Sequence, residues 1–167
     1  MVIAKKALIL GIGGQDGCLL ARSLLIKGFK VIGVSRKNLQ GYASFTKLGI
    51  NNEIELIQVD VTKKDAIIKL IEDVQPDEIY NLAAQSSVSK SFSHSTETIN
   101  TIVVGSLNIL EASKTIEYDG RIFFAGSSEI FGHTDKAACI NTSHDPRSPY
   151  GVGKQASFNL VKIYRES

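Results

Sequence analysis

The stretch that decides the fold lies near the N-terminus, where residues 7–17 have the sequence ALILGIGGQDG. A short apolar run passes directly into glycines at positions 11, 14 and 17, and residues 16–27 continue as a helical segment. In dinucleotide-binding domains a strand, a glycine-rich turn and a helix follow one another in this way, and the helix N-terminus faces a pyrophosphate. This stretch therefore predicts an α/β domain that binds a dinucleotide.

The rest of the chain alternates short apolar runs with amphipathic segments, and no linker or repeat interrupts it. With residues 7–10 as the first strand, four more strands are expected at residues 30–34, 54–59, 78–82 and 121–125. Helices are expected at residues 16–27, behind Thr62, and over residues 99–112 and 149–164. Strands that alternate with helices form parallel sheets, so we expect a Rossmann-type doubly wound parallel sheet.

The helix expected between the third and fourth strands begins with a Thr62-x-x-Asp65 pattern. This spacing is that of a capping box, in which the first side chain bonds a backbone N–H three residues later. Apolar residues then recur at helical spacing up to Val74, and Pro76 prevents the helix from continuing. We therefore expect Thr62 to cap this helix.

The composition excludes several classes of function. The chain has 167 residues, 43% of them hydrophobic and 22% charged, which suits one soluble domain with a real core. A net charge of +2 and the lack of a basic stripe argue against a nucleic-acid or membrane partner. Cys18 and Cys139 are too few for a disulfide framework, so a reduced, cytoplasmic compartment is expected. The histidines at positions 94, 133 and 144 lack metal-ligand spacing, so no metal site is expected.

The glycines of the first turn have separate expected roles. Gly11 permits a tight turn, Gly14 lets the backbone approach a pyrophosphate, and Gly17 lets the helix pack closely on the strand. A glycine-rich turn without a ligand is the alternative interpretation. The residues of this segment expected to contact the cofactor are Gly11, Ile12, Gly14, Gln15, Asp16 and Gly17.

The end of the second strand indicates which dinucleotide is bound. This strand ends in Val34-Ser35-Arg36-Lys37, without the acidic residue that would bind an unphosphorylated ribose. An arginine at this place accepts a 2′-phosphate, so Arg36 and Lys37 favour NADP over NAD. The alternative is that both side chains are simply solvated.

The ends of the third and fourth strands are expected to contribute to the same site. Asp60 follows the third strand, where it either accepts a hydrogen bond from an adenine amino group or caps a helix. Small and amide side chains end the fourth strand, at the edge of the sheet where ligands bind. The cofactor contacts expected in these segments are Asp60, Val61, Leu82, Ala83, Ala84, Gln85 and Ser86.

The C-terminal part of the chain holds the candidate catalytic groups. Tyr150 and Lys154 are one helical turn apart and therefore share a helix face. A phenol has an ordinary pKa of about 10, so it acts as a base at neutral pH only beside a cation. Lys154 supplies that cation and can also hold a ribose hydroxyl, so both residues are expected cofactor contacts as well. Ser127, at the end of the fifth strand, is placed to hydrogen-bond a substrate oxygen.

These residues resemble the extended short-chain dehydrogenase/reductases, and within them the GDP-mannose 4,6-dehydratase family. The resemblance covers nearly the whole chain. It rests on GIGGQDG at residues 11–17, VQPDEIYNLAAQS at 74–86, SSEIFG at 127–132, PRSPY at 146–150 and YRES at 164–167. Of these stretches, QDG and PRSPY are much more specific than the tyrosine–lysine pair.

The resemblance implies a catalytic set made of Ser127, Glu129, Tyr150 and Lys154. In the family's reaction the tyrosine removes the 4-hydroxyl proton of GDP-mannose while C4 passes a hydride to NADP⁺. The glutamate then removes the C5 proton, water leaves from C6, and the hydride returns to C6. The implied function is a hydro-lyase that regenerates its own cofactor.

The chain also departs from the resembled family. Leu10, Gly13 and Ser87 replace a threonine, a threonine and a histidine, and Glu97 stands where a cofactor-contacting tyrosine is usual. Family members are much longer, so residues 1–167 are expected to be an NADP-binding domain that lacks the substrate domain and is inactive alone. The alternatives are another nucleotide-sugar epimerase or reductase and a non-catalytic dinucleotide-binding module. The resemblance further implies a homo-oligomer, either a dimer or a tetramer.

Overall fold

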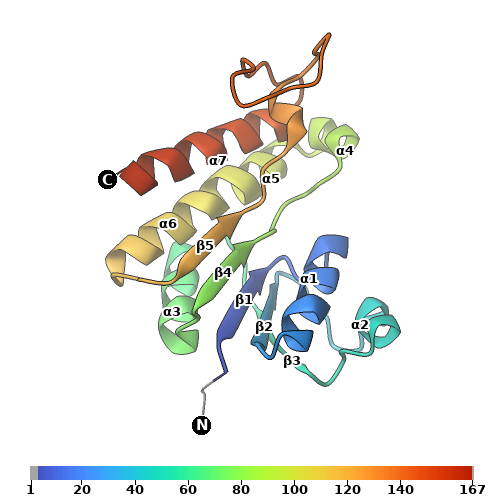
Figure 1. Ribbon diagram of the computed structural model, residues 1–167, viewed down its shortest axis with the longest axis vertical. Helices are drawn as coiled ribbons and strands as arrows, with labels where there is room; N and C mark the ends of the chain where they lie inside the picture. Colours follow the sequence, from blue (N-terminus) through green and yellow to red (C-terminus); the bar gives the residue numbers. More distant parts are fainter. Residues whose placement is uncertain (1–3, 167) are drawn as a thin grey trace.

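Five parallel strands form one sheet in the order β3-β2-β1-β4-β5 (Figure 1). The computed structural model describes residues 4–166, so Ser167, the last residue of the YRES stretch, lies outside the described residues. The strands are β1 (Lys6–Leu10), β2 (Lys30–Ser35), β3 (Ile54–Gln58), β4 (Glu78–Asn81) and β5 (Arg121–Phe124). The predicted parallel sheet is confirmed, and each strand ends within about one residue of its predicted limits.

The order of the strands reverses at β1, which lies between β2 and β4. Leu10 at the end of β1 is in register with Val34 of β2 and Asn81 of β4, so these three strands end level with one another. In parallel sheets the crevice beyond the carboxyl ends of the strands at such a reversal is where ligands bind. The turn after β1 therefore opens between the segments that follow β2 and β4.

Helices cover both faces of the sheet (Figure 1). The α-helices are α1 (Gln15–Ile26), α2 (Ala43–Leu48), α3 (Lys64–Val74), α4 (Val88–Ser93), α5 (Ser95–Ile99), α6 (Gly105–Thr115) and α7 (Pro149–Glu166). A π-helical turn, η1 (Asn100–Val104), joins α5 to α6, and a 3-10 turn, η2 (Ser128–Ile130), follows β5. The sequence predicts one helix where α5, η1 and α6 run on, and it does not predict α2 or α4, which are too short to show a period.

The sheet separates two hydrophobic clusters. Along β1 the side chains alternate, so that Leu8 and Leu10 join the cluster with α3 and α6, while Ala7 and Ile9 join the cluster with α1 and α2. Burial on both faces is the reason why the strands have continuous apolar runs. Helix α7 packs against α5, η1 and α6, which places the C-terminal helix beside the first of these clusters (Figure 1).

The predicted capping box at Thr62 is wrong. Asp60 Oδ1 accepts hydrogen bonds from the Thr62 N–H at 2.9 Å and from the Thr62 hydroxyl at 2.8 Å. The hydroxyl is therefore used in a turn that precedes the helix, and α3 begins at Lys64 with Lys63 as its N-cap residue. The Asp60 carboxylate, two residues upstream, competes with the helix for the Thr62 hydroxyl. The Thr62-x-x-Asp65 spacing alone does not reveal this competitor.

Close packing of α1 on the turn after β1 requires a residue without a side chain. A Cβ atom on Gly17 would lie 2.7 Å from the carbonyl oxygen of Gly11 and 2.7 Å from the Cα atom of Ile12. Both are backbone atoms, which move aside only if the helix itself shifts. Gly17 thus has the close-packing role that the sequence predicts for it.

Gly17→Ala should lower the free energy of unfolding by about 1–3 kcal/mol, because overpacking forces the backbone to shift. Urea unfolding followed by circular dichroism measures this change. Gly126→Ala is the matched control, since a Cβ on Gly126 would meet no described atom within 4 Å, and it should change stability by less than about 0.5 kcal/mol. Equal effects of the two substitutions would contradict the role assigned to Gly17.

Candidate active site

Two cavities meet at the carboxyl edge of the sheet, beyond the ends of β1, β2 and β4. The larger has a volume of about 570 Å³ and the smaller a volume of about 230 Å³. Gly11, Ser35 and Ala84 line both cavities, so the two together form one elongated groove. This groove lies where the strand order reverses, which is the place where the fold is expected to bind a ligand.

The glycine-rich turn lines the groove where the two cavities meet. Gly11 has a φ of +86°, a conformation that favours glycine, and its N–H donates to the Val34 carbonyl oxygen at 2.9 Å. The Ile12 N–H donates to the same oxygen at 3.2 Å, and the Ile12 side chain is fully buried in the core. Ile12, a predicted cofactor contact, therefore uses both its N–H and its side chain to build the turn.

The first turn of α1 opens into the larger cavity. Gln15, Asp16 and Gly17 line this cavity and follow Gly14, which is the N-cap residue. Amides in the first turn of a helix have no carbonyl partner within the helix, and the helix dipole adds positive potential there. Lys37 lines the same cavity and contributes a full positive charge. This part of the groove therefore suits a pyrophosphate.

The segment after β2 folds over the glycine-rich turn, which the sequence does not predict. Leu39 and Tyr42 line the larger cavity, and the Tyr42 hydroxyl donates to the Gly13 carbonyl oxygen at 3.1 Å. A Cβ atom on Gly13 would lie 3.0 Å from the Leu39 side chain. The lack of a side chain at Gly13 thus leaves room for Leu39 to cover the turn.

Most of the predicted cofactor contacts line one cavity or the other. Those in the larger cavity are Gly11, Gly14, Gln15, Asp16, Gly17, Lys37, Leu82, Ala84, Ser86, Tyr150 and Lys154. Those in the smaller cavity are Gly11, Arg36, Asp60, Val61, Ala83, Ala84 and Gln85. Glu97 from α5 and Thr101 from η1 also line the smaller cavity. The family resemblance already pointed to position 97 as a cofactor contact, whereas Thr101 was not predicted, because sequence patterns do not show how a long helix is positioned against a sheet.

Asp60 both forms a turn and lines the smaller cavity. The Thr62 N–H is the main cause that lowers the pKa of Asp60, and Arg36 adds a smaller attraction. The carboxylate is therefore charged at neutral pH where it faces the cavity. Asp60 does not form the helix cap that was one interpretation, since Lys63 is the N-cap residue of α3 and Asp60 bonds Thr62 in the turn before it. Its place in the lining of the cavity is consistent with the other interpretation, a contact to an adenine amino group.

Tyr150 and Lys154 share one face of α7 and both line the larger cavity. The Lys154 Nζ atom lies 5.7 Å from the centroid of the Tyr150 ring and donates to the Ala125 carbonyl oxygen at 2.8 Å. Lys154 is only 8% exposed, and this burial lowers its pKa. An ammonium group is thus fixed between the end of β5 and the phenol, which is the arrangement that stabilises a phenolate.

Ser127 and Glu129 follow β5 on the turn η2. The Ser127 Oγ atom accepts a hydrogen bond from the Glu129 N–H at 3.2 Å and thereby caps the turn. The Glu129 carbonyl oxygen lies 2.7 Å from the position that a Cβ on Gly151 would occupy, so η2 packs directly on the residue after Tyr150. Both side chains are half-buried. The fold thus brings the segments that carry all four candidate catalytic residues together beside the N-terminal half of α7.

Buried hydrogen bonds hold α7 in place relative to the sheet. The Ser157 hydroxyl on α7 donates to Ser106 Oγ on α6 at 2.6 Å, and the Asn81 amide at the end of β4 donates to the same oxygen at 3.4 Å. Asn81 Oδ1 in turn accepts a hydrogen bond from the Ala83 N–H at 3.2 Å. The Asn81 side chain, through Ser106, therefore connects α7 to the loop that lines both cavities.

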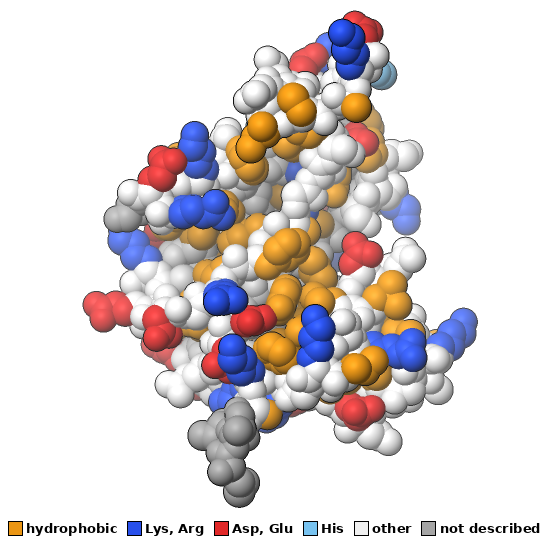
Figure 2. Space-filling view, viewed as in Figure 1, with side chains coloured by type: hydrophobic (Ala, Val, Ile, Leu, Met, Phe, Trp, Pro, Cys, Tyr) orange, Lys and Arg blue, Asp and Glu red, His pale blue; other side chains and the backbone are white. Residues whose placement is uncertain are grey.

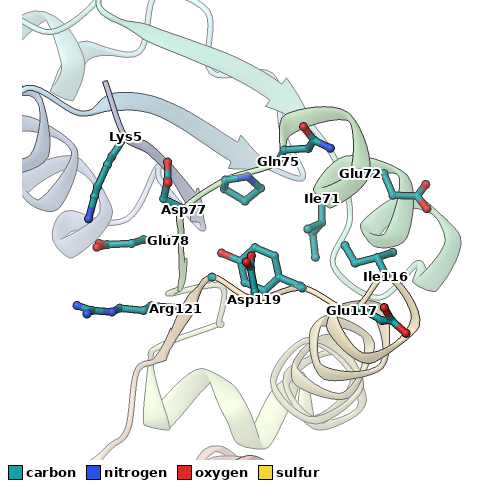
Figure 3. A pocket seen from close by; sticks show the side chains of 13 residues that line it. Lys5, Ile71, Glu72, Gln75, Asp77, Glu78, Ile116, Glu117, Asp119 and Arg121 are labelled. Atoms are coloured by element: carbon teal, nitrogen blue, oxygen red, sulfur yellow. The ribbon is translucent and has the colours of Figure 1, made fainter. Parts of the chain in front are cut away.

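A cavity of about 760 Å³, larger than the two described above, lies at the opposite edge of the sheet (Figure 3). Lys5, Asp77, Glu78 and Arg121 line it at the amino ends of β1, β4 and β5, and Asp119 lies beside them. Doubly wound sheets bind their ligands at the carboxyl edge. Size alone therefore does not make this cavity the candidate site, and Tyr150 and its partners lie elsewhere.

Two further features bear on the classes of function. Within residues 4–166, no cluster of three or more His, Cys, Asp or Glu side chains is arranged to hold a metal ion. Over the same described stretch, none of the helices combines the length and the apolar character that crossing a bilayer requires.

Solved structures with the same fold place this domain in a class. A UDP-glucose 4-epimerase from Thermus thermophilus, solved with NAD, superimposes with a TM-score of 0.82 at 22% identity and covers 96% of this chain and 51% of its own. A UDP-glucuronic acid 4-epimerase from Bacillus cereus, solved with UDP-glucuronic acid and NAD, gives a TM-score of 0.83 at 25% identity, with coverages of 97% and 52%. Fold and site together define a Rossmann-type domain of the short-chain dehydrogenase/reductases.

Comparison at the level of sequence identifies the family. A family model described as GDP-mannose 4,6 dehydratase matches residues 8–167. The GDP-mannose 4,6-dehydratase of Yersinia enterocolitica is 38% identical over 176 residues, covering 98% of this chain and 46% of the relative. The human GDP-mannose 4,6 dehydratase is 36% identical over 171 residues, with coverages of 96% and 46%. The chain belongs to the GDP-mannose 4,6-dehydratase family, and it spans about half the length of these curated relatives.

Lys154→Met should remove a contribution to stability that depends on pH. Burial lowers the pKa of Lys154 in the folded chain, so between that pKa and the unfolded value of about 10.4 the unfolded chain binds more protons. The stability contributed by this side chain therefore rises with pH across that window. Urea unfolding at about pH 7 and about pH 9.5 should show a smaller increase in the variant than in the wild type.

Lys162→Met is the matched control for this measurement, because Lys162 is an exposed lysine on the same helix. Its pH dependence should equal that of the wild type. If Lys154→Met also left the dependence unchanged, the buried ammonium would not be the group responsible.

Proposed function

We propose that the chain is the cofactor-binding and catalytic part of an NADP-dependent GDP-mannose 4,6-dehydratase, a hydro-lyase of nucleotide-sugar metabolism. The observation that carries the proposal is the position of Glu129, whose turn packs on the residue that follows Tyr150. A dehydratase must remove a proton from C5 of the sugar, and a plain reductase or epimerase need not do so. Membership of the family supports GDP-mannose as the substrate.

The residues of the groove fit a nicotinamide dinucleotide. The two cavities form one elongated groove that extends from Arg36 to Lys154, with glycines and the first turn of α1 between them. Similar solved structures that contain NAD support this class of cofactor. Gly14 and the amides after it would hold the pyrophosphate, Arg36 and Asp60 the adenosine half, and Lys154 the nicotinamide ribose. A cofactor held by these residues would supply reversible hydride transfer to and from the sugar.

Each catalytic side chain has one task in this proposal. Tyr150, as a phenolate stabilised by Lys154, removes the proton of the 4-hydroxyl group, while Ser127 donates a hydrogen bond to the same sugar oxygen. The ketone formed at C4 makes the C5–H bond acidic. Glu129 then takes the C5 proton, and the C6 hydroxyl group leaves as water with one of the two protons that Tyr150 and Glu129 have taken. The 4-keto-6-deoxy product would be completed when the hydride returns to C6 and the remaining proton to C5.

Two alternatives stand beside this proposal. The similar solved structures include 4-epimerases, and an enzyme of that kind would use Tyr150 and Lys154 without needing Glu129 as a base. The second alternative is a non-catalytic dinucleotide-binding module, which would use the groove without the four candidate catalytic residues. Substitution of Glu129 in a full-length form separates the first alternative from the proposal, and an activity assay of the unsubstituted full-length form tests the second.

We also propose that the full protein is a cytoplasmic homo-oligomer, a dimer or a tetramer. Val152, Phe158 and Ile163 on α7 are 47%, 50% and 59% exposed. Figure 2 shows further hydrophobic side chains gathered along the middle of one face of the molecule. Cys18 and Cys139 are free thiols, which suits a reduced compartment. Light scattering at micromolar concentration gives the mass in solution, and a monomer would count against the oligomer.

The chain should bind NADPH more tightly than NADH, because Arg36 lines the smaller cavity at the end of β2. Arg36→Gln should weaken NADPH binding about tenfold and leave NADH binding nearly unchanged, since it removes a charge-assisted contact to the 2′-phosphate. Fluorescence titration with each reduced nucleotide measures both Kd values. Lys30→Gln, which removes a positive charge at the opposite end of β2, is the control. Equal affinities or a preference for NADH in the wild type would contradict the choice of NADP.

A full-length form should convert GDP-mannose to GDP-4-keto-6-deoxymannose, and the 167-residue chain alone should not. Holding the sugar within reach of the cofactor can lower the activation barrier by about 7–11 kcal/mol. In the relatives, the half of the length that this chain does not cover would have to hold the sugar in this way. In the full-length form, Glu129→Gln should lower turnover by about 10²–10⁴ without weakening cofactor binding, because the amide keeps the size but is not a base. Tyr150→Phe should stop the first oxidation.

Mass spectrometry of the nucleotide sugar measures the product of both variants. Near-normal turnover by Glu129→Gln would contradict the dehydratase. It would indicate an epimerase or a reductase that acts through Tyr150 and Lys154.

A further inference from the structure

Arg36, the residue that favours NADP, already has a partner in the smaller cavity. Its guanidinium group lies 2.7 Å from the Glu97 carboxylate, and both side chains line the cavity. The hydrogen bond from Arg36 is the main reason why the pKa of Glu97 is lowered, so the carboxylate is charged at neutral pH. The pair is about half exposed, at 54% and 43%, so either side chain can exchange its partner for another.

The two partners come from elements whose backbones are held in place. The Gln58 side chain donates to the Arg36 carbonyl oxygen at 3.1 Å, and the Lys37 N–H donates to Ser35 Oγ at 3.1 Å, which shapes the turn after β2. Glu97 stands on α5, in the helical run that continues through η1. The pairing therefore does not depend on a chance approach of two loops.

The balance of charge in the smaller cavity does not favour a phosphate. Its charged lining consists of the carboxylates of Asp60 and Glu97 and the guanidinium group of Arg36. Lys37, the other basic residue after β2, lines the larger cavity. A 2′-phosphate that enters this cavity must therefore displace Glu97 from Arg36 and then remain near two negative charges.

We propose that Glu97 sets how strongly this site prefers NADP over NAD, by competing with the ribose 2′-phosphate for Arg36. The inference rests on the proposed dinucleotide-binding function and names a specificity residue within it. A free ribose 2′-hydroxyl can donate a hydrogen bond to the Glu97 carboxylate, which stands in for the acidic residue that the end of β2 lacks. Glu97 thus weakens the binding of NADP and favours the binding of NAD. The preference for NADP that Arg36 creates therefore becomes smaller.

Glu97→Gln tests this competition, because the amide keeps the shape of the side chain and removes its charge. The Kd for NADPH should fall by about five- to tenfold, and the Kd for NADH should stay the same or rise. Fluorescence titrations with NADPH and with NADH give the ratio of the two constants. Glu97→Ala should move the ratio in the same direction, and Glu97 is exposed, so neither substitution threatens the fold.

Two controls isolate the contact between Glu97 and Arg36. Glu55→Gln removes the same charge from a comparable ion pair, since Glu55 lies 2.8 Å from Lys30 with about half of each side chain exposed, and it should leave the ratio unchanged. In an Arg36→Gln background, Glu97→Gln should lose most of its effect on NADPH, because there is no longer a guanidinium group to compete for.

The results separate this inference from the proposed function. A wild-type chain that binds the nucleotides, with a ratio that neither Glu97 variant changes, would overturn the role of Glu97 and leave the proposed function standing. The role of Glu97 would also be overturned if Glu55→Gln shifted the ratio as much as Glu97→Gln does. A wild-type chain that binds neither NADPH nor NADH would overturn both.

Discussion

The close approach of α1 to the turn after β1 is the constraint on which the rest of the site depends. At Gly17 the helix meets the backbone of Gly11 and Ile12 at a distance that leaves no room for a Cβ atom. At Gly11 the turn meets the backbone of Leu82 and Ala83, where a Cβ would lie 2.8 Å away. These contacts fix the direction of α1 and hold the segment after β4 beside the turn, so the floor of the groove is set by contacts between backbones.

Lys154 shows how a group that is costly to bury serves the site. Transfer of an ammonium group from water into the protein is unfavourable, and the depressed pKa of Lys154 reflects that cost. Its hydrogen bond to the Ala125 carbonyl oxygen compensates part of it. The same ammonium lies 5.7 Å from the centroid of the Tyr150 ring, so burial and the hydrogen bond to Ala125 together fix a positive charge beside the phenol.

Features encoded over a few residues could be predicted from the sequence, and features set by contacts between distant segments could not. The strands, the turn at Gly11 and the pairing of Tyr150 with Lys154 depend on local periodicity and spacing, and the fold has them where they were predicted. The prediction that Thr62 caps α3 is wrong because the Thr62 hydroxyl donates its hydrogen bond to Asp60 Oδ1. The cover formed by Leu39 and Tyr42 over the turn depends on how an irregular segment folds back, which leaves no pattern in the sequence.

The choice of cofactor illustrates the same boundary between local and distant information. The rule that an acidic residue at the end of the second strand indicates NAD concerns a single position. The electrostatic potential in a cavity, however, depends on every charged side chain that lines it. Here that strand end holds Arg36, and the carboxylate is supplied by Glu97 from α5, a segment far along the chain. The basic residues after β2 are also divided, since Arg36 lines one cavity and Lys37 the other. A strand end therefore determines which charge can reach the ribose, while the helices around it determine how much of that charge is free to bind a phosphate.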